Sequence, residues 1–257
     1  FMHRNLSIDL TYGCGKYDYT NGILICVAPG QLGGKADNGT RINLDGWSLL
    51  FHPDLLQGTQ LGKRIKEYSF FDYRVNEALH MTDSEFDTFD SLMRQIKQEL
   101  ESPRDTLQDN IIVGYIELIL NFCRRFYNRQ FLTRRLENSD ILSRFETLLH
   151  EYFSNNNQIE NGLPSMRYFS DKLCMSANYL GDLIKKTTGI TATSHIRRFI
   201  IQETKNHLAS GMSISETAYT LGFEYPHHLS RMFKKHEGMS PSRYLESIKA
   251  GGNGPVR

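Results

Sequence analysis

The sequence predicts an α+β protein of two domains, in which a small antiparallel β-structure with several helices is followed by an all-α domain. Three features predict this fold class. Residues 8–75 alternate short apolar runs with turn signals, residues from 83 onward place apolar side chains at helical spacing, and a basic helical element occurs twice after residue 163. The chain of 257 residues is long enough for two domains of ordinary size.

The composition narrows the class of protein. The chain is 39% hydrophobic and 23% charged, which is typical of a globular protein, and no apolar run reaches the ~18 residues of a membrane span. The first ten residues contain no signal-peptide core, so we expect a cytoplasmic protein, and a start at Phe1 is compatible with a β-domain that is truncated at its beginning. The scattered cysteines indicate neither a zinc site nor a disulfide framework: Cys14, Cys26, Cys123 and Cys174.

Charge is divided unevenly along the chain. From Gln158 onward there are 13 Lys and Arg against 8 Asp and Glu, a net charge of +5, whereas the residues before it carry −4. A basic part joined to an acidic part indicates that one of them meets a polyanion, although a solvated basic face would give the same count.

The β-structure is expected at about residues 8–75. The run GILICVA (residues 22–28) is apolar and rich in β-branched residues, and PGQLGG stops it. ADNGT (residues 36–40) contains an Asn-Gly turn signal, and WSLLF (residues 47–51) predicts a further strand that ends before Pro53.

Helices follow the β-structure. Three amphipathic ones are expected, at about residues 83–100, 109–130 and 140–153. Thr82 and Glu85 form a capping box at the start of the first, and the apolar stripe of the second is wide enough to cover the β-structure and also meet a second subunit. SNNNQIENGLP is polar and contains Gly and Pro, so residues 155–163 are predicted as a linker.

The rest of the chain is predicted as short helices, with a flexible tail at residues 250–257. The helices lie at about residues 164–173, 177–188, 192–208, 214–221, 226–237 and 241–249. Short helices joined by tight turns leave little room for a catalytic cleft and are typical of a DNA-binding bundle.

Two segments of this helical part share one pattern. LIKKTTGITA (residues 183–192) and MFKKHEGMSP (residues 232–241) lie 49 positions apart and repeat two apolar residues, a Lys pair, two polar residues and Gly. Each copy fits the second helix of a helix-turn-helix. In the later copy Gly222 supplies the tight turn, Phe223 fills the space between the helices, and Pro226 stands in the first turn, where its missing N–H costs little.

Basic side chains project from the second helix of the later copy. They are His227, His228, Arg231, Lys234 and Lys235. Arg can donate two hydrogen bonds to guanine O6 and N7, and Lys contacts phosphates. One copy alone would be explained by a solvated basic face, but two copies in register, joined by a long helix, favour double-stranded DNA as the partner.

The C-terminal sequence resembles the AraC/XylS family of bacterial transcription regulators. LGFEYPHHLSRMFKKHEGMSPSRYL (residues 221–245) is similar to the signature region of that family, and ANYLGDLIKKTTGITATSHI (residues 177–196) to its first half-motif, so the resemblance covers residues 163–249. It implies two helix-turn-helix units, held apart by a linker helix, whose recognition helices enter successive major grooves about 34 Å apart.

The resemblance also assigns reading positions. The first recognition helix would present Asn178 and Asp182 to base edges, and the second would present Pro226, His227 and Arg231. The other expected DNA contacts are Lys185, Lys186, Arg197, His228, Lys234 and Lys235.

The first recognition helix lacks the side chains usually expected of a base-reading helix. Gly181 has no side chain to read with, and Asp182 repels phosphate although it can accept from cytosine N4, so this helix is expected mainly to position the protein. Cys174 stands where a turn glycine is common.

Relatives of this kind carry an N-terminal sensor, often a cupin-like barrel followed by dimerising helices, so the resemblance implies a small-molecule effector and a homodimer. The candidate effector wall is Tyr12, Tyr17, Tyr19, Trp47, Phe51, His52, Phe70, Phe71 and Tyr73. The candidate dimer face is Ile112, Tyr115, Ile119, Phe122 and Phe126. Both sets have an alternative, because aromatic clusters often form the core and a helix can be buried against its own domain.

The residues argue against catalysis. The four His of the acidic part are too far apart in sequence for the closely spaced His of a cupin metal site, and no P-loop, G-x-G-x-x-G, G-x-S-x-G or H-E-x-x-H motif occurs. We therefore expect no enzyme activity, no metal and no cofactor.

The sequence thus predicts a sequence-specific, DNA-binding transcription regulator. Residues 1–154 would sense an effector and dimerise, residues 155–163 would link, and residues 164–249 would bind DNA; RNA polymerase is a further expected partner. One alternative is an architectural or non-specific DNA binder, with an affinity nearly independent of sequence. A less favoured one is a cupin-type enzyme with a DNA-binding tail, which bound metal or turnover would reveal.

Overall fold

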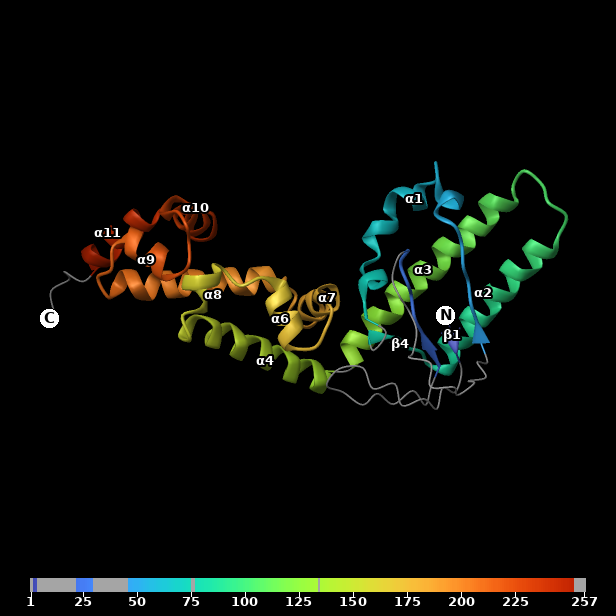
Figure 1. Cartoon of the computed structure of the whole chain (residues 1–257), viewed down its shortest axis with the longest axis horizontal. Coiled ribbons are helices and arrows are strands. Elements are labelled where there is room, and N and C mark those ends of the chain that lie inside the picture. Colours follow the sequence, from blue (N-terminus) through green and yellow to red (C-terminus); the bar gives the residue numbers. More distant parts are fainter. Residues whose placement is uncertain (1, 4–21, 30–45, 75–76, 134, 252–257) are drawn as a thin grey trace. The chain divides into compact units, whose positions relative to one another are not determined.

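The computed structural model describes residues 2–3, 22–29, 46–74, 77–133 and 135–251 (Figure 1). It forms two compact units. One comprises Phe1–Asn138 and Cys174–Thr187, and the other comprises Ser139–Leu173 and Thr188–Arg257. The first unit therefore includes the segment predicted as the first recognition helix, so the compact units do not follow the domain boundaries predicted at residues 154 and 164.

A small antiparallel sheet lies in the first unit. In the described residues it has the order β3-β1-β2-β4, with strands Met2–His3 (β1), Ile23–Leu24 (β2), Gly46–Trp47 (β3) and Leu79–His80 (β4). Met2 pairs with both Leu24 and Trp47, and Ile23 pairs with His80. The pairing is antiparallel, as predicted, while residues 8–21 and 30–45 of the predicted β-structure lie outside the described residues.

Residues 53–72 are helical, and the prediction of strand and turn is wrong there. They form η1 (Pro53–Leu56), α1 (Gln60–Arg64), η2 (Ile65–Glu67) and η3 (Ser69–Asp72). The Thr59 hydroxyl accepts the Gly62 N–H at 3.0 Å and so caps α1. The Tyr68 hydroxyl donates to the Asn121 side chain at 3.2 Å. The cap of Thr59 thus satisfies a backbone N–H locally, and the Tyr68 side chain ties this segment to α3.

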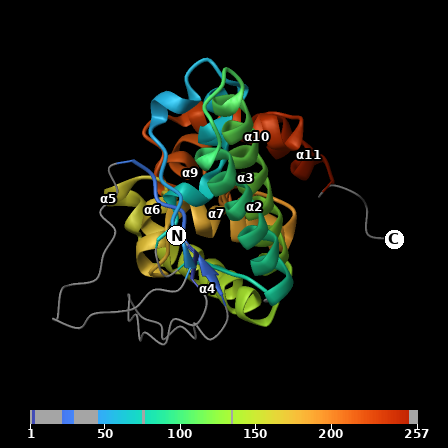
Figure 2. The ribbon, with the colours of Figure 1, turned by 90° about the vertical axis from the view of Figure 1, so that its right-hand side faces the viewer.

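Two long helices form the core of the first unit. The helices α2 (Asp83–Glu101) and α3 (Gln108–Thr133) lie side by side in Figures 1 and 2. The capping box of Thr82 and Glu85 is confirmed. Buried Phe89 and Phe126 meet between the helices with ring centroids 5.8 Å apart. This aromatic packing explains the wide apolar stripe of α3.

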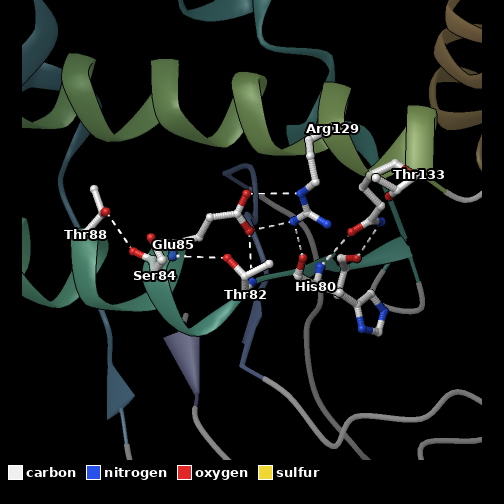
Figure 3. Close-up of polar contacts among 9 residues, drawn as sticks. His80, Thr82, Ser84, Glu85, Thr88, Arg129 and Thr133 are labelled. Atoms are coloured by element: carbon white, nitrogen blue, oxygen red, sulfur yellow. Dashed lines mark hydrogen bonds and ion pairs between the residues drawn. The ribbon is translucent and has the colours of Figure 1, made fainter.

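Two side chains of α3, Arg129 and Gln130, hold the edge strand β4. Figure 3 shows Arg129 between Glu85 and His80. The Arg129 guanidinium donates to the Glu85 carboxylate at 3.1 and 2.6 Å and to the His80 carbonyl at 2.6 Å. The Gln130 side chain accepts the His80 N–H at 2.8 Å and donates to the Ala78 carbonyl at 3.3 Å. Side chains of α3 therefore satisfy edge groups of β4 that would otherwise need a further strand.

Helices make up the rest of the described chain, as predicted. They are α4 (Arg135–Ser154), α5 (Asn157–Asn161), α6 (Met166–Lys172), α7 (Ala177–Thr188), α8 (Ala192–Ala209), α9 (Ile214–Thr220), α10 (Pro226–Glu237) and α11 (Pro241–Gly251). Of these, α7 belongs to the first unit. In the second unit, α8, α9, α10 and α11 pack together (Figure 1).

The segment predicted as a linker contains a helix. In α5 the side chain of Gln158 is buried and its amide donates to the Thr220 carbonyl at 3.0 Å, at the end of α9. Gly222, in the left-handed region with φ of 81°, lies against the same turn of α5. A polar residue of segment 155–163 therefore makes a buried contact with α9. Local sequence rules, which predict a linker from polar composition, do not reveal this contact.

We expect Gly222→Ala to lower the free energy of unfolding by about 2 kcal/mol or more. A Cβ at this position would lie 2.5 Å from the Gln158 carbonyl oxygen, in addition to the strain of the left-handed backbone. Gly211→Ala is the matched control, because Gly211 also has a positive φ, of 96°, but an added Cβ would meet no atom within 4 Å. The control should lose only about 1 kcal/mol. Urea denaturation measures both, and equal losses would contradict the proposed contact.

Candidate nucleic-acid interface

The second helix-turn-helix consists of α9, a tight turn and α10. Ser213 caps α9 in a capping box with Glu216. Ala218 is fully buried where the two helices meet, and Leu229 and Phe233 point into the core with no exposed surface. The inward face of α10 is thus the one that the apolar spacing predicts, and the basic residues are left on the outside.

The outer face of α10 is positively charged and accessible. His227, His228, Arg231, Lys234 and Lys235 are all exposed. Within the described part of the chain, no hydrogen bond or ion pair engages the side chains of Arg231, Lys234 or Lys235. These three cations are therefore available to phosphates or base edges.

The N-terminus of α10 is also open. Pro226 occupies its first turn, and the N-cap residue Tyr225 contributes no side-chain hydrogen bond. The rings of Tyr225, His227 and His228 cluster around this end, with the two His centroids 4.2 Å apart. An uncapped helix N-terminus offers N–H groups and a positive dipole end to an anion such as a DNA phosphate.

An ion pair fixes the other end of α10. Lys205 of α8 lies 2.7 Å from the Glu237 carboxylate, and both side chains are about three-quarters buried. The hydrogen bond from Lys205 lowers the pKa of Glu237 below its ordinary value, and a contact with His236 contributes to the same effect. This pair holds the C-terminal end of α10 on the long helix α8.

The helix α7, predicted as the first recognition helix, has the same inner face as α10. Leu180, Leu183 and Ile184 have no exposed surface. Lys185 and Lys186 are exposed near its C-terminus. In the turn before α7, Cys174 has a φ of 58°, so it adopts the left-handed conformation in which a turn glycine is common.

The two base-reading residues predicted on α7 are engaged by other parts of the first unit. The Asn178 amide donates to the Asp72 carboxylate at 2.8 Å. The Asp182 carboxylate accepts hydrogen bonds from Ser69 at 2.5 Å and Tyr73 at 2.6 Å. These partners are more than 100 residues away in sequence, so spacing rules could not reveal them.

Arg197, the DNA contact predicted on α8, is exposed, whereas neighbouring Ile196 is buried. The structure therefore leaves the Arg197 guanidinium on the surface of the second unit. His195 is partly buried on the same helix, 3.0 Å from the Thr188 hydroxyl, and burial lowers the pKa of its imidazole.

The described residues of the predicted effector wall differ in their surroundings. Trp47 is partly buried, donates to the Asp90 carboxylate at 2.7 Å and has the Arg94 guanidinium 5.9 Å from its ring. The side chain of His52 is 77% exposed and caps η1. Phe51 and Phe71 are partly buried, whereas Phe70 and Tyr73 belong to the core; Tyr12, Tyr17 and Tyr19 lie outside the described residues.

The predicted dimer face divides into two sets. Ile112, Ile119 and Phe126 are each only 7% exposed and lie in the core of the first unit, where they are not available to a second subunit. Tyr115 and Phe122 are partly exposed, and the neighbouring positions Ile111 and Leu118 are 40% and 42% exposed. The accessible apolar face of α3 is therefore rotated from the predicted one.

The described residues offer neither a metal-binding cluster nor a membrane span. They contain no group of three or more His, Cys, Asp or Glu side chains arranged to hold a metal ion. None of their helices is long and apolar enough to cross a membrane.

Comparison with known proteins matches the C-terminal helices. Residues 169–247 match a family described as a helix-turn-helix domain, which confirms the resemblance to AraC-type regulators for this part of the chain. Over 85 residues the chain is 33% identical to the uncharacterized transcriptional regulatory protein YesN of Bacillus subtilis. That match covers 32% of this chain and 23% of YesN, so the chain spans about a quarter of the length of this relative.

Two solved structures are similar to part of the chain. The C-terminal domain of the response regulator yesN from Fusobacterium nucleatum is 23% identical with a TM-score of 0.34, and the match covers 39% of this chain and 96% of that one. The C-terminal domain of AraT, a response regulator from Geobacillus stearothermophilus, is 24% identical with a TM-score of 0.37, with coverages of 42% and 84%.

We expect Lys205→Met to lower the free energy of unfolding by about 1 kcal/mol at pH 7, because it removes a close, largely buried ion pair but keeps the apolar stem. Since the folded-state pKa of Glu237 is lowered, the stabilisation is present above the ordinary value of 4.5 and is lost as pH falls through the folded-state pKa. The difference from wild type should therefore shrink in acid. Lys97→Met is the control, because Lys97 and Glu101 are 3.8 Å apart and both mostly exposed. A loss in K205M that is independent of pH would contradict the ion-pair explanation.

Proposed function

We propose that this protein is a sequence-specific, DNA-binding transcription regulator that reads DNA with two helices, α7 and α10. The observation that carries the proposal is α10, a helix of a confirmed helix-turn-helix domain whose exposed face holds three unpaired cations and whose N-terminus is uncapped. The relative YesN is described as a transcriptional regulatory protein, which supports the same role.

The chemistry of α10 suits the major groove. Arg231 can donate two hydrogen bonds to guanine, and His227 can donate or accept at a neighbouring base edge. Lys234 and Lys235 lie one turn further along the helix and suit phosphates. Because Leu229 and Phe233 fix the opposite face in the core, the orientation of the reading face is determined by packing.

Binding-site selection from a random duplex library tests the proposal, with enrichment measured at about 50 and 200 mM salt. We expect a motif with base preferences to be enriched at both salt concentrations. A flat library with steeply salt-dependent binding would instead identify a non-specific DNA binder, since that binding depends on phosphate charge alone. An absence of binding at both salt concentrations would refute a role in DNA binding.

Arg231→Ala should weaken binding to the enriched duplex by about 1–3 kcal/mol and relax the preference at one base pair. Lys235→Ala should weaken binding to enriched and random duplexes alike and reduce the salt slope by about 1. The two variants are controls for each other, because both remove one exposed cation from the same helix. Competition titrations at several salt concentrations measure both effects, and identical behaviour of the two variants would contradict the assigned roles.

We further propose that the protein dimerises through α3. Ile111, Tyr115, Leu118 and Phe122 follow a spacing of four, three and four residues, which is the spacing of a coiled-coil seam. A small-molecule effector bound in the first unit and a contact with RNA polymerase belong to the same proposal, and their support is the AraC-type resemblance alone.

Leu118→Glu should raise the dissociation constant of the dimer at least tenfold, because it places a charge in the centre of the α3 seam. Leu50→Glu is the control, since Leu50 is even more exposed, at 77%, but does not lie on α3. Sedimentation equilibrium measures both variants. A wild-type protein that is monomeric at all concentrations would refute the proposed dimer.

A further inference from the structure

The helix α7 is held within the first unit by four polar side chains, Ser69, Asp72, Tyr73 and Glu77, which we call the latch. Three latch residues bind the outer face of α7. Asp72 accepts from Asn178, and Ser69 and Tyr73 both donate to Asp182. Burial and the nearby Asp182 carboxylate raise the pKa of Tyr73, so its hydroxyl stays protonated and able to donate.

The fourth latch residue, Glu77, binds the N-terminus of α7. Ser176 is the residue before α7, and its hydroxyl accepts the Tyr179 N–H at 3.2 Å. Its own N–H and hydroxyl donate to the two Glu77 carboxylate oxygens at 2.6 and 2.5 Å. Glu77 is only 5% exposed. A carboxylate thus lies at the helix N-terminus, where a DNA phosphate commonly binds a recognition helix.

An aromatic contact adds to these polar ones. The ring of Tyr179 on α7 is buried between Tyr73 and Phe131, with centroids 5.1 Å from each. Tyr73 in turn contacts Tyr127 of α3 at 5.1 Å. Tyr73 therefore makes two contacts with α7: its hydroxyl donates to Asp182, and its ring packs against Tyr179.

The helix α10 provides the comparison within the same chain. Its reading face is exposed and its N-terminus is uncapped, whereas the corresponding face of α7 is bonded to the latch and its N-terminus meets Glu77. The difference lies in the surroundings, because the inner faces of both helices are packed in the same way.

We infer that the latch is an autoinhibitory contact, in which Ser69, Asp72, Tyr73 and Glu77 occupy the DNA-reading face and the phosphate-binding end of α7. This inference rests on the proposed function. DNA and the latch require the same atoms of Asn178 and Asp182, so α7 reads DNA only after the latch opens. The apparent affinity for a two-block site then equals the affinity of the open form multiplied by the fraction of molecules in which the latch is open.

The test uses the variant Ser69→Ala/Tyr73→Phe in the full chain. It removes both hydroxyl donors to Asp182. It leaves every residue of α7 unchanged and keeps an aromatic ring at position 73. Tyr68→Phe is the matched control, because the Tyr68 hydroxyl belongs to the same unit and donates to Asn121 rather than to α7. Urea denaturation establishes that all three proteins are folded.

Wild type, S69A/Y73F and Y68F are each used to select duplexes from the same random library. We expect wild type and Y68F to enrich mainly one block of bases, and the released variant to enrich two blocks about one helical turn apart. S69A/Y73F should bind the two-block duplex at least about tenfold more tightly than wild type does. Equal motifs and equal affinities in all three proteins would overturn the latch but leave the proposed function intact. A flat library for all three would overturn both.

A second measurement needs no variant. Saturating two-block duplex should change the NMR ring signals of Tyr179, because release of α7 takes this ring out of its buried site between Tyr73 and Phe131. Unchanged Tyr179 ring signals on the bound duplex would refute the latch.

Discussion

The buried carboxylate of Glu77 is the interaction on which the arrangement of the first unit depends. A charge at this depth must be satisfied by hydrogen bonds, and Glu77 accepts three, two from Ser176 and one from the Arg74 N–H at 2.7 Å. Even so, burial raises the pKa of its carboxyl above the ordinary value. Its backbone carbonyl accepts the Tyr127 hydroxyl at 3.2 Å, which ties the same residue to α3. One residue thus joins the long helix of the first unit to the start of α7.

The helices α7 and α10 show how one repeated element can occupy two different environments. The positions that pack are equivalent, since Leu180 corresponds to Leu229 and Ile184 to Phe233, and all four have no exposed surface. The positions at the helix start differ. Ser176 gives α7 a capped N-terminus that also donates to a carboxylate, whereas Pro226 gives α10 a fixed first turn with no side-chain cap. Core packing therefore preserves the fold of both copies, while the caps at their starts and the residues around them differ.

The sequence predicted features whose cause is local. The apolar period placed the helices of residues 83–249 within a few residues, and Thr82 with Glu85 marked the start of α2. The short helices at residues 53–72 were missed because their cause is partly remote, in contacts such as that of Tyr68 with Asn121. The helix α5 was missed for the same reason, since Gln158 is ordered by a carbonyl 62 positions away. The partners of Asn178 and Asp182 could not be predicted from residue spacing, because they lie more than 100 positions away in the sequence.

Tyr73 lies next to residues of the predicted effector wall and also contacts α7, so it could couple effector binding to DNA binding. Its neighbours in sequence, Phe70 and Phe71, were predicted for that wall, and their rings lie 5.3 Å apart. A ligand can shift an equilibrium only by the difference between its affinities for the two states. A ligand that bound among these rings and displaced Tyr73 would break the hydrogen bond to Asp182 and the ring contact with Tyr179 together. Its binding would therefore be coupled to release of α7 through one side chain, and by the same linkage DNA bound to α7 would raise the affinity for that ligand.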